Sequence, residues 1–231
     1  MQVAGLDSRA VLKAAAPALF RVPVGVAVTD PRGPLANLYQ TETDYIACAV
    51  AGRQCEFAAG RTAARDAMRQ LGQPPCAIPA GSDRAPIWPA GLTGSISHTK
   101  SLCVAVVTRD AASIGIDLEE ATPLDPQLIP TICTMDEQAQ IAGADMALRA
   151  KLVFSAKEAA YKAQYPLTKA LFGFDHFAVA LNLERQTFKA TFQMDVGRFK
   201  EGHVLQGRFV DVAGHFVTAV TLPLDEYEGW I

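Results

Sequence analysis

The stretch Ile114-Gly115-Ile116-Asp117-Leu118-Glu119 alternates apolar side chains with a glycine and two carboxylates. Successive side chains of a strand point to opposite faces, so the pattern predicts a strand whose isoleucine and leucine side chains enter a core. Asp117 and Glu119 then project together from the other face. Two neighbouring carboxylates repel each other, which raises a pKa or requires a cation. An acidic pair is also common on a solvated strand surface, and this segment alone leaves both interpretations open.

The segments on either side of this strand predict an α+β fold with antiparallel sheets. An apolar stretch covers Val22–Val28, and strands are expected at Leu102–Thr108, Ser113–Leu118, Phe177–Leu183, Thr187–Met194, Val204–Val212 and Phe216–Leu222. Helical spacing predicts helices at about Thr43–Leu71, Asp136–Ile141 and Met146–Gln164, the last ended by Pro166. This order of elements does not alternate as βαβ units do, which favours antiparallel pairing.

The order of elements also suggests two lobes, residues 1–112 and residues 113–231, each with a long helix followed by strands. Residues 72–93 form a loop that contains five prolines. Loops of that length without secondary structure of their own are often functional.

Composition excludes several classes of protein. The 231 residues carry 21 basic and 24 acidic side chains, so a general attraction to nucleic acid or anionic lipid is not expected. The five cysteines include no C-x-x-C pair, which argues against a disulfide framework and a structural zinc site. Neither a signal peptide nor an apolar run long enough to span a membrane is visible. We therefore expect a cytoplasmic protein.

A second segment with candidate chemistry is Phe154-Ser155-Ala156-Lys157-Glu158-Ala159-Ala160-Tyr161-Lys162. Glu158 and Lys162 are four residues apart and share one helix face, and Lys157 and Tyr161 form the adjacent ridge. The same spacing is typical of an ordinary surface ion pair, so the helix alone does not decide between the two.

Two further segments have the composition of an anion site. Gly91–His98 follows the proline-rich loop; its glycines let backbone N–H groups approach an anion, and Ser97 and His98 add donors. Three arginines, whose guanidinium forks match phosphate oxygens, are spaced by four along the first long helix: Arg61, Arg65 and Arg69. The alternatives are a turn that enters a strand and a solvated helix face.

Together and in this order, the segments resemble the 4′-phosphopantetheinyl transferase superfamily. The likeness is closer to its larger, monomeric type, which includes surfactin synthetase activators and the enterobactin synthase component. The three motifs of the family correspond here to Gly94–His98, Ile114–Glu119 and Phe154–Lys162. Phe57–Arg65 and Pro86–Pro89 match an upstream helix and a Pro-x-Trp-Pro loop of the enterobactin-type branch.

The resemblance implies transfer of the 4′-phosphopantetheine arm of coenzyme A to a serine of an apo acyl or peptidyl carrier protein. The reaction releases adenosine 3′,5′-bisphosphate and depends on Mg²⁺. Carriers of siderophore or other secondary-metabolite synthases are the expected partners. The main alternative is a coenzyme A-binding regulatory or scaffold protein without turnover; a more remote one is a Mg²⁺-dependent phosphotransferase that acts on a free nucleotide.

The resemblance also implies a fold and an oligomeric state. The fold would be a pseudo-dimer of two similar lobes, each a small antiparallel sheet packed with a long helix. The active site would lie in the cleft between the lobes. We expect a monomer, because both lobes belong to one chain.

By the same resemblance, Asp117, Glu119 and Glu158 would hold Mg²⁺, which prefers carboxylate and phosphate oxygens. Coenzyme A would be bound by Arg53, Arg61, Arg65, Arg84, Ser97, His98, Lys157 and Lys162. Lys162 would also stabilise charge that develops on the pyrophosphate. The general base would be Glu158, Glu137 or a metal-bound water, and Glu137 is alternatively an acid that merely favours a helix dipole.

Overall fold

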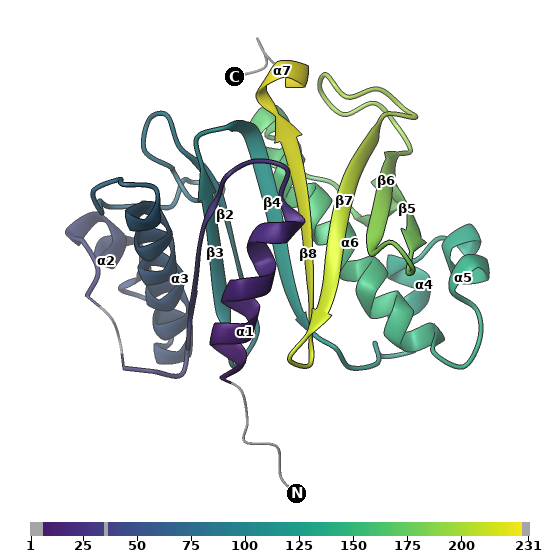
Figure 1. Ribbon diagram of the computed structural model, residues 1–231, viewed down its shortest axis with the longest axis horizontal. Coiled ribbons are helices and arrows are strands. Elements are labelled where there is room, and N and C mark those ends of the chain that lie inside the picture. The colour runs from purple at the N-terminus through teal and green to yellow at the C-terminus, as the bar shows by residue number, and fades with distance from the viewer. Residues whose placement is uncertain (1–6, 35–36, 228–231) are drawn as a thin grey trace, which may run out of the picture.

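The computed structural model describes residues 7–34 and 37–227 of the chain. Its strands form two antiparallel sheets, one of three strands in the order β1-β3-β2 and one of five strands in the order β4-β8-β7-β6-β5 (Figure 1). The strands are β1 (Gly25–Thr29), β2 (Thr93–His98), β3 (Cys103–Thr108), β4 (Ala111–Glu120), β5 (Phe177–Asn182), β6 (Thr187–Phe192), β7 (Val204–Val212) and β8 (His215–Pro223). The helices are α1 (Ser8–Ala15), α2 (Gln40–Ile46), α3 (Ala51–Gln70), α4 (Ile129–Ile132), α5 (Met135–Ile141), α6 (Met146–Thr168) and α7 (Leu224–Tyr227), with 3-10 turns η1 (Ala16–Leu19) and η2 (Phe174–His176). The predicted α+β fold with antiparallel sheets is confirmed.

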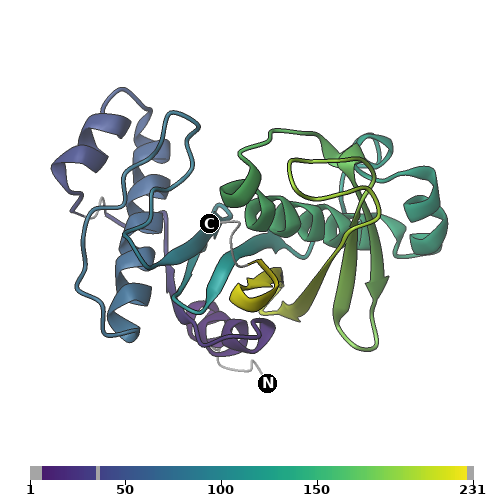
Figure 2. The same ribbon diagram turned by 90° about the horizontal axis from the view of Figure 1, so that it is seen from above.

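In the first half of the chain, α3 packs against the three-stranded sheet (Figure 2). Its buried alanines, Ala63, Ala64 and Ala67, let the helix approach the strands closely. A Cβ added to Gly25 would lie 2.1 Å from the backbone oxygen of Ala67, so β1 needs a glycine at this crossing. The single helix expected at about 43–71 is two helices, because Val50 has extended backbone angles and separates α2 from α3.

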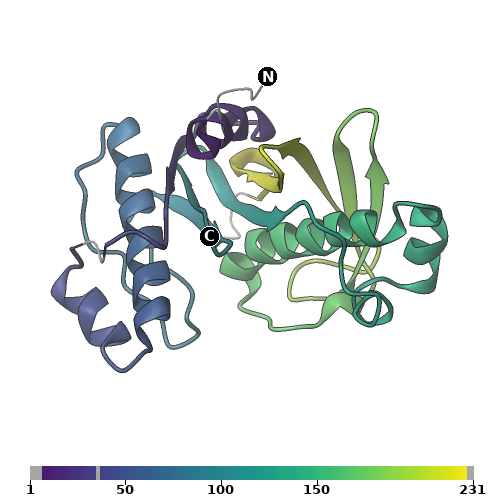
Figure 3. The same cartoon turned by 90° about the horizontal axis from the view of Figure 1, so that it is seen from below.

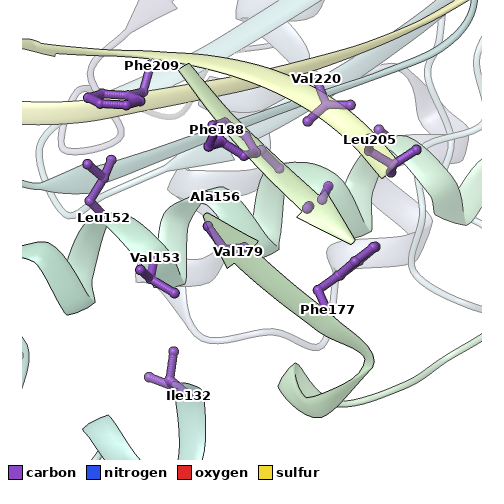
Figure 4. Packing of buried hydrophobic residues seen from close by; sticks show 14 of the residues in the cluster. Ile132, Leu152, Val153, Ala156, Phe177, Val179, Phe188, Leu205, Phe209 and Val220 are labelled. Atoms are coloured by element: carbon purple, nitrogen blue, oxygen red, sulfur yellow. The ribbon is translucent and has the colours of Figure 1, made fainter. Parts of the chain in front are cut away.

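In the second half, α6 covers one face of the five-stranded sheet. Figure 4 shows Leu152, Val153 and Ala156 of this helix among the buried side chains Phe177, Val179, Phe188, Leu205, Phe209 and Val220. A Cβ on Gly115 would lie 1.9 Å from the backbone oxygen of Ala159. The glycine of the Ile-Gly-Ile-Asp stretch therefore sets the distance between β4 and α6.

The end of α6 differs from the prediction. Pro166 lies inside the helix, which continues to Thr168 and ends where Lys169 adopts left-handed backbone angles with φ of 55°. The N–H of Lys169 then donates to the carbonyl of Tyr165 at 2.8 Å. The expectation that Pro166 ends this helix at Gln164 is wrong, because the left-handed cap at Lys169, five residues after Gln164, terminates it instead.

The two sheets meet where β2 lies beside β4. Two serine hydroxyls cross this junction: Ser95 Oγ accepts from the N–H of Ile116 at 3.1 Å, and Ser97 Oγ accepts from the N–H of Leu118 at 3.3 Å. The segment Gly91–His98 is a turn that enters a strand, which was one of its two open interpretations: Gly91 lies in a turn and Thr93–His98 form β2.

On the face of β4 away from α6, α1 and η1 bury Leu12, Ala16 and Leu19 against Ile114, Ile116 and Leu118 (Figure 3). The division into lobes at residue 112 stays a prediction. Among the described residues, no helix is both long and apolar enough to cross a membrane.

Candidate active site

A cavity of about 520 Å³ opens where α3, β2, β4 and α6 come together. The predicted site residues that line it are Arg53, Arg61, Arg84, Ser97, His98, Asp117, Glu119, Glu158 and Lys162. They come from both halves of the chain. The cavity therefore places the basic helix and loop of the first half opposite the acidic strand and helix of the second half.

Asp117 is the most tightly held carboxylate of the cavity and is 3% exposed. Its Oδ1 accepts hydrogen bonds from Ser97 Oγ at 2.9 Å and Lys162 Nζ at 2.7 Å, and its Oδ2 accepts one from Ser155 Oγ at 2.8 Å. Ser155 is itself backed by Thr218, which donates to the carbonyl of Ser155 at 2.8 Å. The three hydrogen bonds to its oxygens hold the Asp117 carboxylate in one orientation toward the cavity.

The other two carboxylates, Glu119 and Glu158, repel each other and Asp117. Burial raises the pKa of Glu119, and the negative charge of Asp117 raises it further. Lys151 opposes this rise, because its Nζ lies 3.2 Å from Glu119 Oε2. Burial also raises the pKa of Glu158, with further contributions from Asp117 and Glu119 that Lys162 partly offsets. The repulsion shows that these carboxylates share one electrostatic environment.

These carboxylates have the donor chemistry for a hard divalent cation, because Mg²⁺ takes carboxylate oxygens and its charge would relieve their mutual repulsion. In the arrangement seen, Lys162 on Asp117 and Lys151 on Glu119 provide positive charge. Within the described part of the chain, no group of three His, Cys, Asp or Glu side chains is drawn together as a metal-binding cluster. The donor types therefore fit the cation, while its ligand set stays a prediction.

The opposite end of the cavity is basic. Arg61 is 6% exposed, its Nε donates to the carbonyl of Ile78 at 2.6 Å, and its guanidinium lies 4.2 Å above the ring of Phe57. Burial lowers the pKa of Arg61 to about 10, so it keeps its charge at neutral pH. Among the described residues, no carboxylate lies within ion-pair distance of Arg61. A buried cation without such a partner is suited to an anionic ligand.

Arg53, His98 and Arg84 also line the cavity. Arg53 Nη1 lies 3.2 Å from His98 Nε2 and donates to Glu56 Oε2 at 3.1 Å. Arg84 has a positive φ of 67° in a turn in which its N–H donates to the carbonyl of Gly81 at 2.9 Å. This turn directs the proline-rich loop toward the cavity.

Arg65 does not line the cavity. Its Nη1 lies 2.9 Å from Glu42 Oε2, and both side chains are buried. Its Nη2 donates to the carbonyl of Asn37 at 3.0 Å. Arg65 therefore joins α3 to α2, although it shares the four-residue spacing of Arg61.

Lys157 and Glu137 do not line the cavity either. They form an ion pair of 2.8 Å in which each side chain is 2% exposed. Lys157 Nζ also donates to the carbonyls of Ile132 and Phe174, and Glu137 accepts from the N–H groups of Thr134 and Val179. All of these groups are satisfied within the fold, so Glu137 is a helix-capping residue with a structural partner.

The cavity is also lined by residues that the sequence motifs did not indicate, among them Asp83, Tyr165 and Lys169. Tyr165 and Lys169, near the end of α6, contact Asp83 of the proline-rich loop: the Tyr165 hydroxyl donates to Asp83 Oδ2 at 2.8 Å, and Lys169 Nζ lies 3.4 Å from it. These contacts close one side of the cavity across the two halves of the chain. The only signal in the sequence was the length of the loop, since the partners are more than 80 residues apart.

Comparison with known proteins places this arrangement in a family. Residues 41–108 match the 4′-phosphopantetheinyl transferase N-terminal domain, and residues 113–220 match the 4′-phosphopantetheinyl transferase superfamily. The chain is 36% identical to 4′-phosphopantetheinyl transferase Svp of Streptomyces mobaraensis over 209 residues, 85% of the chain and 83% of that protein. It is 35% identical to 4′-phosphopantetheinyl transferase PptT of Mycobacterium tuberculosis over 206 residues, 84% and 89% of the two chains. Enterobactin synthase component D of Escherichia coli is 41% identical over 124 residues, 52% and 59% of the two chains.

The chain therefore belongs to the 4′-phosphopantetheinyl transferase superfamily. It is an enzyme, a transferase of this type, which confirms the expectation drawn from its three motifs.

Proposed function

We propose that this enzyme transfers the 4′-phosphopantetheine arm of coenzyme A to a serine of an apo carrier protein in a Mg²⁺-dependent reaction. The observation that carries the proposal is one cavity lined both by the carboxylates Asp117, Glu119 and Glu158 and by cations, of which Arg61 is buried. Coenzyme A has phosphate groups at two separate positions, a 3′-phosphate and a pyrophosphate. A site whose lining includes several separate cations suits such a ligand.

The chemistry is a displacement at phosphorus. The serine Oγ of the carrier forms a bond to the β-phosphorus, the bond to the bridging pyrophosphate oxygen breaks, and adenosine 3′,5′-bisphosphate leaves. Mg²⁺, held by Asp117, Glu119 and Glu158, would supply positive charge to the pyrophosphate oxygens.

The residues of the chain have separate parts in this reaction. Lys162, which is 26% exposed at its side chain and faces Asp117, stabilises the charge that develops on the leaving group. Glu158 takes the proton of the carrier serine, since its carboxylate lines the cavity together with Asp117, Glu119 and Lys162. Glu137 is too deeply buried and too fully hydrogen-bonded for that task.

Arg61 binds the 3′-phosphate of coenzyme A, with Arg53, His98 and Arg84 beside it. Ser97 also lines the cavity, and its hydroxyl contacts both Asp117 and Lys162. The likeness to enterobactin synthase component D favours carriers of siderophore or other secondary-metabolite synthases. The enzyme acts as a monomer, because both halves of the cavity belong to one chain.

The test is mass spectrometry of an apo carrier protein incubated with the enzyme, coenzyme A and Mg²⁺. We expect the carrier to gain one phosphopantetheine group, and to gain none when EDTA is added or when the variant is Asp117→Asn. Asp110→Asn, which alters an exposed aspartate in the turn before β4, is the matched control and keeps the activity. Bound coenzyme A without transfer to any acyl or peptidyl carrier would contradict the proposal, and so would turnover of coenzyme A without a carrier.

A further inference from the structure

A second cavity, of about 250 Å³, lies on the outer face of the five-stranded sheet. It is bordered by the end of η1, by the turn after β5 and by strands β6, β7 and β8. We call it the basic groove, because the charged residues that line it are Arg21, Arg185, Lys189 and Arg208. No residue is shared between the basic groove and the active-site cavity.

The two sites lie on opposite faces of the same sheet. Along β7 the exposed and buried residues alternate, with Leu205 and Phe209 in the core beneath α6. Gln206 and Arg208 therefore point to the other face. Ala219, the register partner of Arg208, belongs to the core that α1 and η1 cover. A ligand in the basic groove is thus separated from Asp117 and Glu158 by the thickness of the sheet.

The charge of the basic groove is not balanced locally. Within the described residues, none of its four cations has a carboxylate at ion-pair distance. The outer-face positions of β5, β6 and β7 carry no acidic side chain; they are Ala178, Ala180, Asn182, Thr187, Lys189, Thr191, Val204, Gln206, Arg208, Val210 and Val212. In a chain of net charge −3, such a concentration of cations favours an anionic ligand.

Two of the arginines are held in place by the fold. Arg21 Nη2 donates to Gln206 Oε1 at 2.6 Å, and Arg208 Nη1 donates to the carbonyl of Ala18 at 3.0 Å. Each of these contacts uses one N–H of a guanidinium that has five, so donors remain for a ligand. Both arginines are exposed, so their remaining N–H groups are accessible to an oxyanion in the basic groove.

A polar atom beneath the basic groove has no partner. Thr221, on β8, lines the groove, and its hydroxyl is buried without a hydrogen-bond partner among the described residues. Buried hydroxyls are almost always hydrogen-bonded to protein, water or a bound group. Thr187, which also lines the basic groove, adds a neutral hydroxyl donor.

We propose that the basic groove binds a phosphate-bearing small molecule in solution, through a phosphate ester or polyphosphate group. Tetrahedral phosphate oxygens match arginine forks and hydroxyl donors together. The concave shape between η1 and the strands suits a compact ligand better than the flat surface of a bilayer. This site is independent of the transfer reaction, because its residues lie on the opposite face of the sheet.

The test is calorimetric titration of the enzyme with inorganic pyrophosphate in metal-free buffer. Pyrophosphate that enters the active site does not contact the basic groove, so variants of the groove residues separate the two kinds of binding. We expect one pyrophosphate per chain to bind in the basic groove. The double variant Lys189→Gln and Arg208→Gln should weaken this binding by tenfold or more, since hydrogen bonds to charged groups contribute about 1.5–3 kcal/mol each.

The matched control is the double variant Arg109→Gln and Arg149→Gln, which removes the same charge at sites outside the basic groove. It should bind pyrophosphate as the unmodified enzyme does. The proposal is overturned if the unmodified enzyme binds no pyrophosphate beyond the active site, or if the control weakens binding equally. Binding to phosphatidylserine vesicles that Lys189→Gln and Arg208→Gln abolish, without pyrophosphate binding, would also overturn it.

Both double variants should keep their thermal melting behaviour and their transfer of phosphopantetheine. Transfer is measured in parallel with the titration. A failure of pyrophosphate to bind in the basic groove is therefore distinguishable from a failure of the enzyme to transfer phosphopantetheine.

Discussion

At the scale of single residues, Ser155 is the contact that orients Asp117 from behind. Its hydroxyl donates to Asp117 Oδ2 at 2.8 Å, and it is fully buried. Ser155→Ala removes a hydrogen bond to a buried charge, which costs about 1.5–3 kcal/mol of stability. We expect the Mg²⁺ concentration for half-maximal transfer to rise severalfold as well, because the carboxylate is held less firmly.

Thr218→Val is the matched control for this variant. Thr218 supports Ser155 at 2.8 Å and makes no hydrogen bond to Asp117. The Thr218→Val variant should lower the free energy of unfolding by a similar amount and leave the Mg²⁺ dependence of transfer unchanged. Equal shifts of the Mg²⁺ dependence in both variants would show that Ser155 has only a structural part. Chemical denaturation and Mg²⁺ titration of the activity supply the two measurements.

Arg61 and Arg69 occupy the same ridge of α3 and differ in their surroundings. Arg61 is buried at the cavity, while Arg69 is exposed and pairs with Asp66. We expect Arg61→Gln to raise the KM for coenzyme A by about tenfold, which corresponds to one charged hydrogen bond. Its effect on the KM for dephospho-coenzyme A should be much smaller, and Arg69→Gln should change neither KM. Equal effects of Arg61→Gln on both substrates would exclude contact with the 3′-phosphate.

At the scale of elements, the packing of α6 on β4 positions the acidic half of the site. A Cβ at residue 115 would lie 1.9 Å from Ala159 O and 2.7 Å from Ala163 N, which are backbone atoms of α6. Neither atom moves without shifting the helix that carries Glu158 and Lys162. Gly115→Ala should therefore lower the free energy of unfolding by about 1–3 kcal/mol or more and reduce transfer strongly.

Gly52→Ala gives the matched comparison. Gly52 lies in the exposed first turn of α3, and a Cβ there would meet no atom within 4 Å. Alanine is favoured over glycine in a helix by about 1 kcal/mol, so this variant should be neutral or more stable, with normal activity. Urea unfolding curves of both variants provide the measurement. A Gly115→Ala protein as stable and active as the Gly52→Ala protein would contradict the close packing.

At the scale of the whole molecule, the contact between Asp83 and Tyr165 links the proline-rich loop of the first half to α6 of the second. The pKa of Asp83 lies below its ordinary value, mainly because its carboxylate accepts the hydrogen bond from Tyr165. Asp83 therefore stays ionised and continues to accept this hydrogen bond. Tyr165→Phe removes one hydroxyl and keeps the ring at the cavity wall. We expect the KM for coenzyme A to rise about two- to tenfold, the range that one hydrogen bond contributes.

Tyr39→Phe is the control at this scale. The Tyr39 hydroxyl donates to the carbonyl of Pro75 at 3.2 Å, which also joins a helical segment to the proline-rich loop, but Tyr39 does not line the cavity. Its removal should leave the KM for coenzyme A unchanged. The measurement is the KM for coenzyme A of both variants, from steady-state kinetics at saturating carrier protein. An unchanged KM in Tyr165→Phe would show that the contact between Tyr165 and Asp83 does not contribute to coenzyme A binding.

The amino-acid sequence by itself determined the local features of this enzyme. Alternation at Ile114–Glu119 placed Asp117 and Glu119 on one face, and they do line one cavity. The order of motifs was sufficient to identify the family, and strand β7 lies where alternation predicted it. Such features depend on neighbours a few residues away, so spacing alone reveals them.

Only the tertiary structure decided which of several equally spaced side chains reach the cavity. Arg61 and Arg65 are four residues apart, yet Arg65 turns to Glu42, a partner 23 residues away. Lys157 and Glu158 are adjacent, yet Lys157 is buried with Glu137 while Glu158 faces the carboxylates. Burial of a charge requires a specific partner, and that partner is brought near by long-range packing that no local pattern encodes.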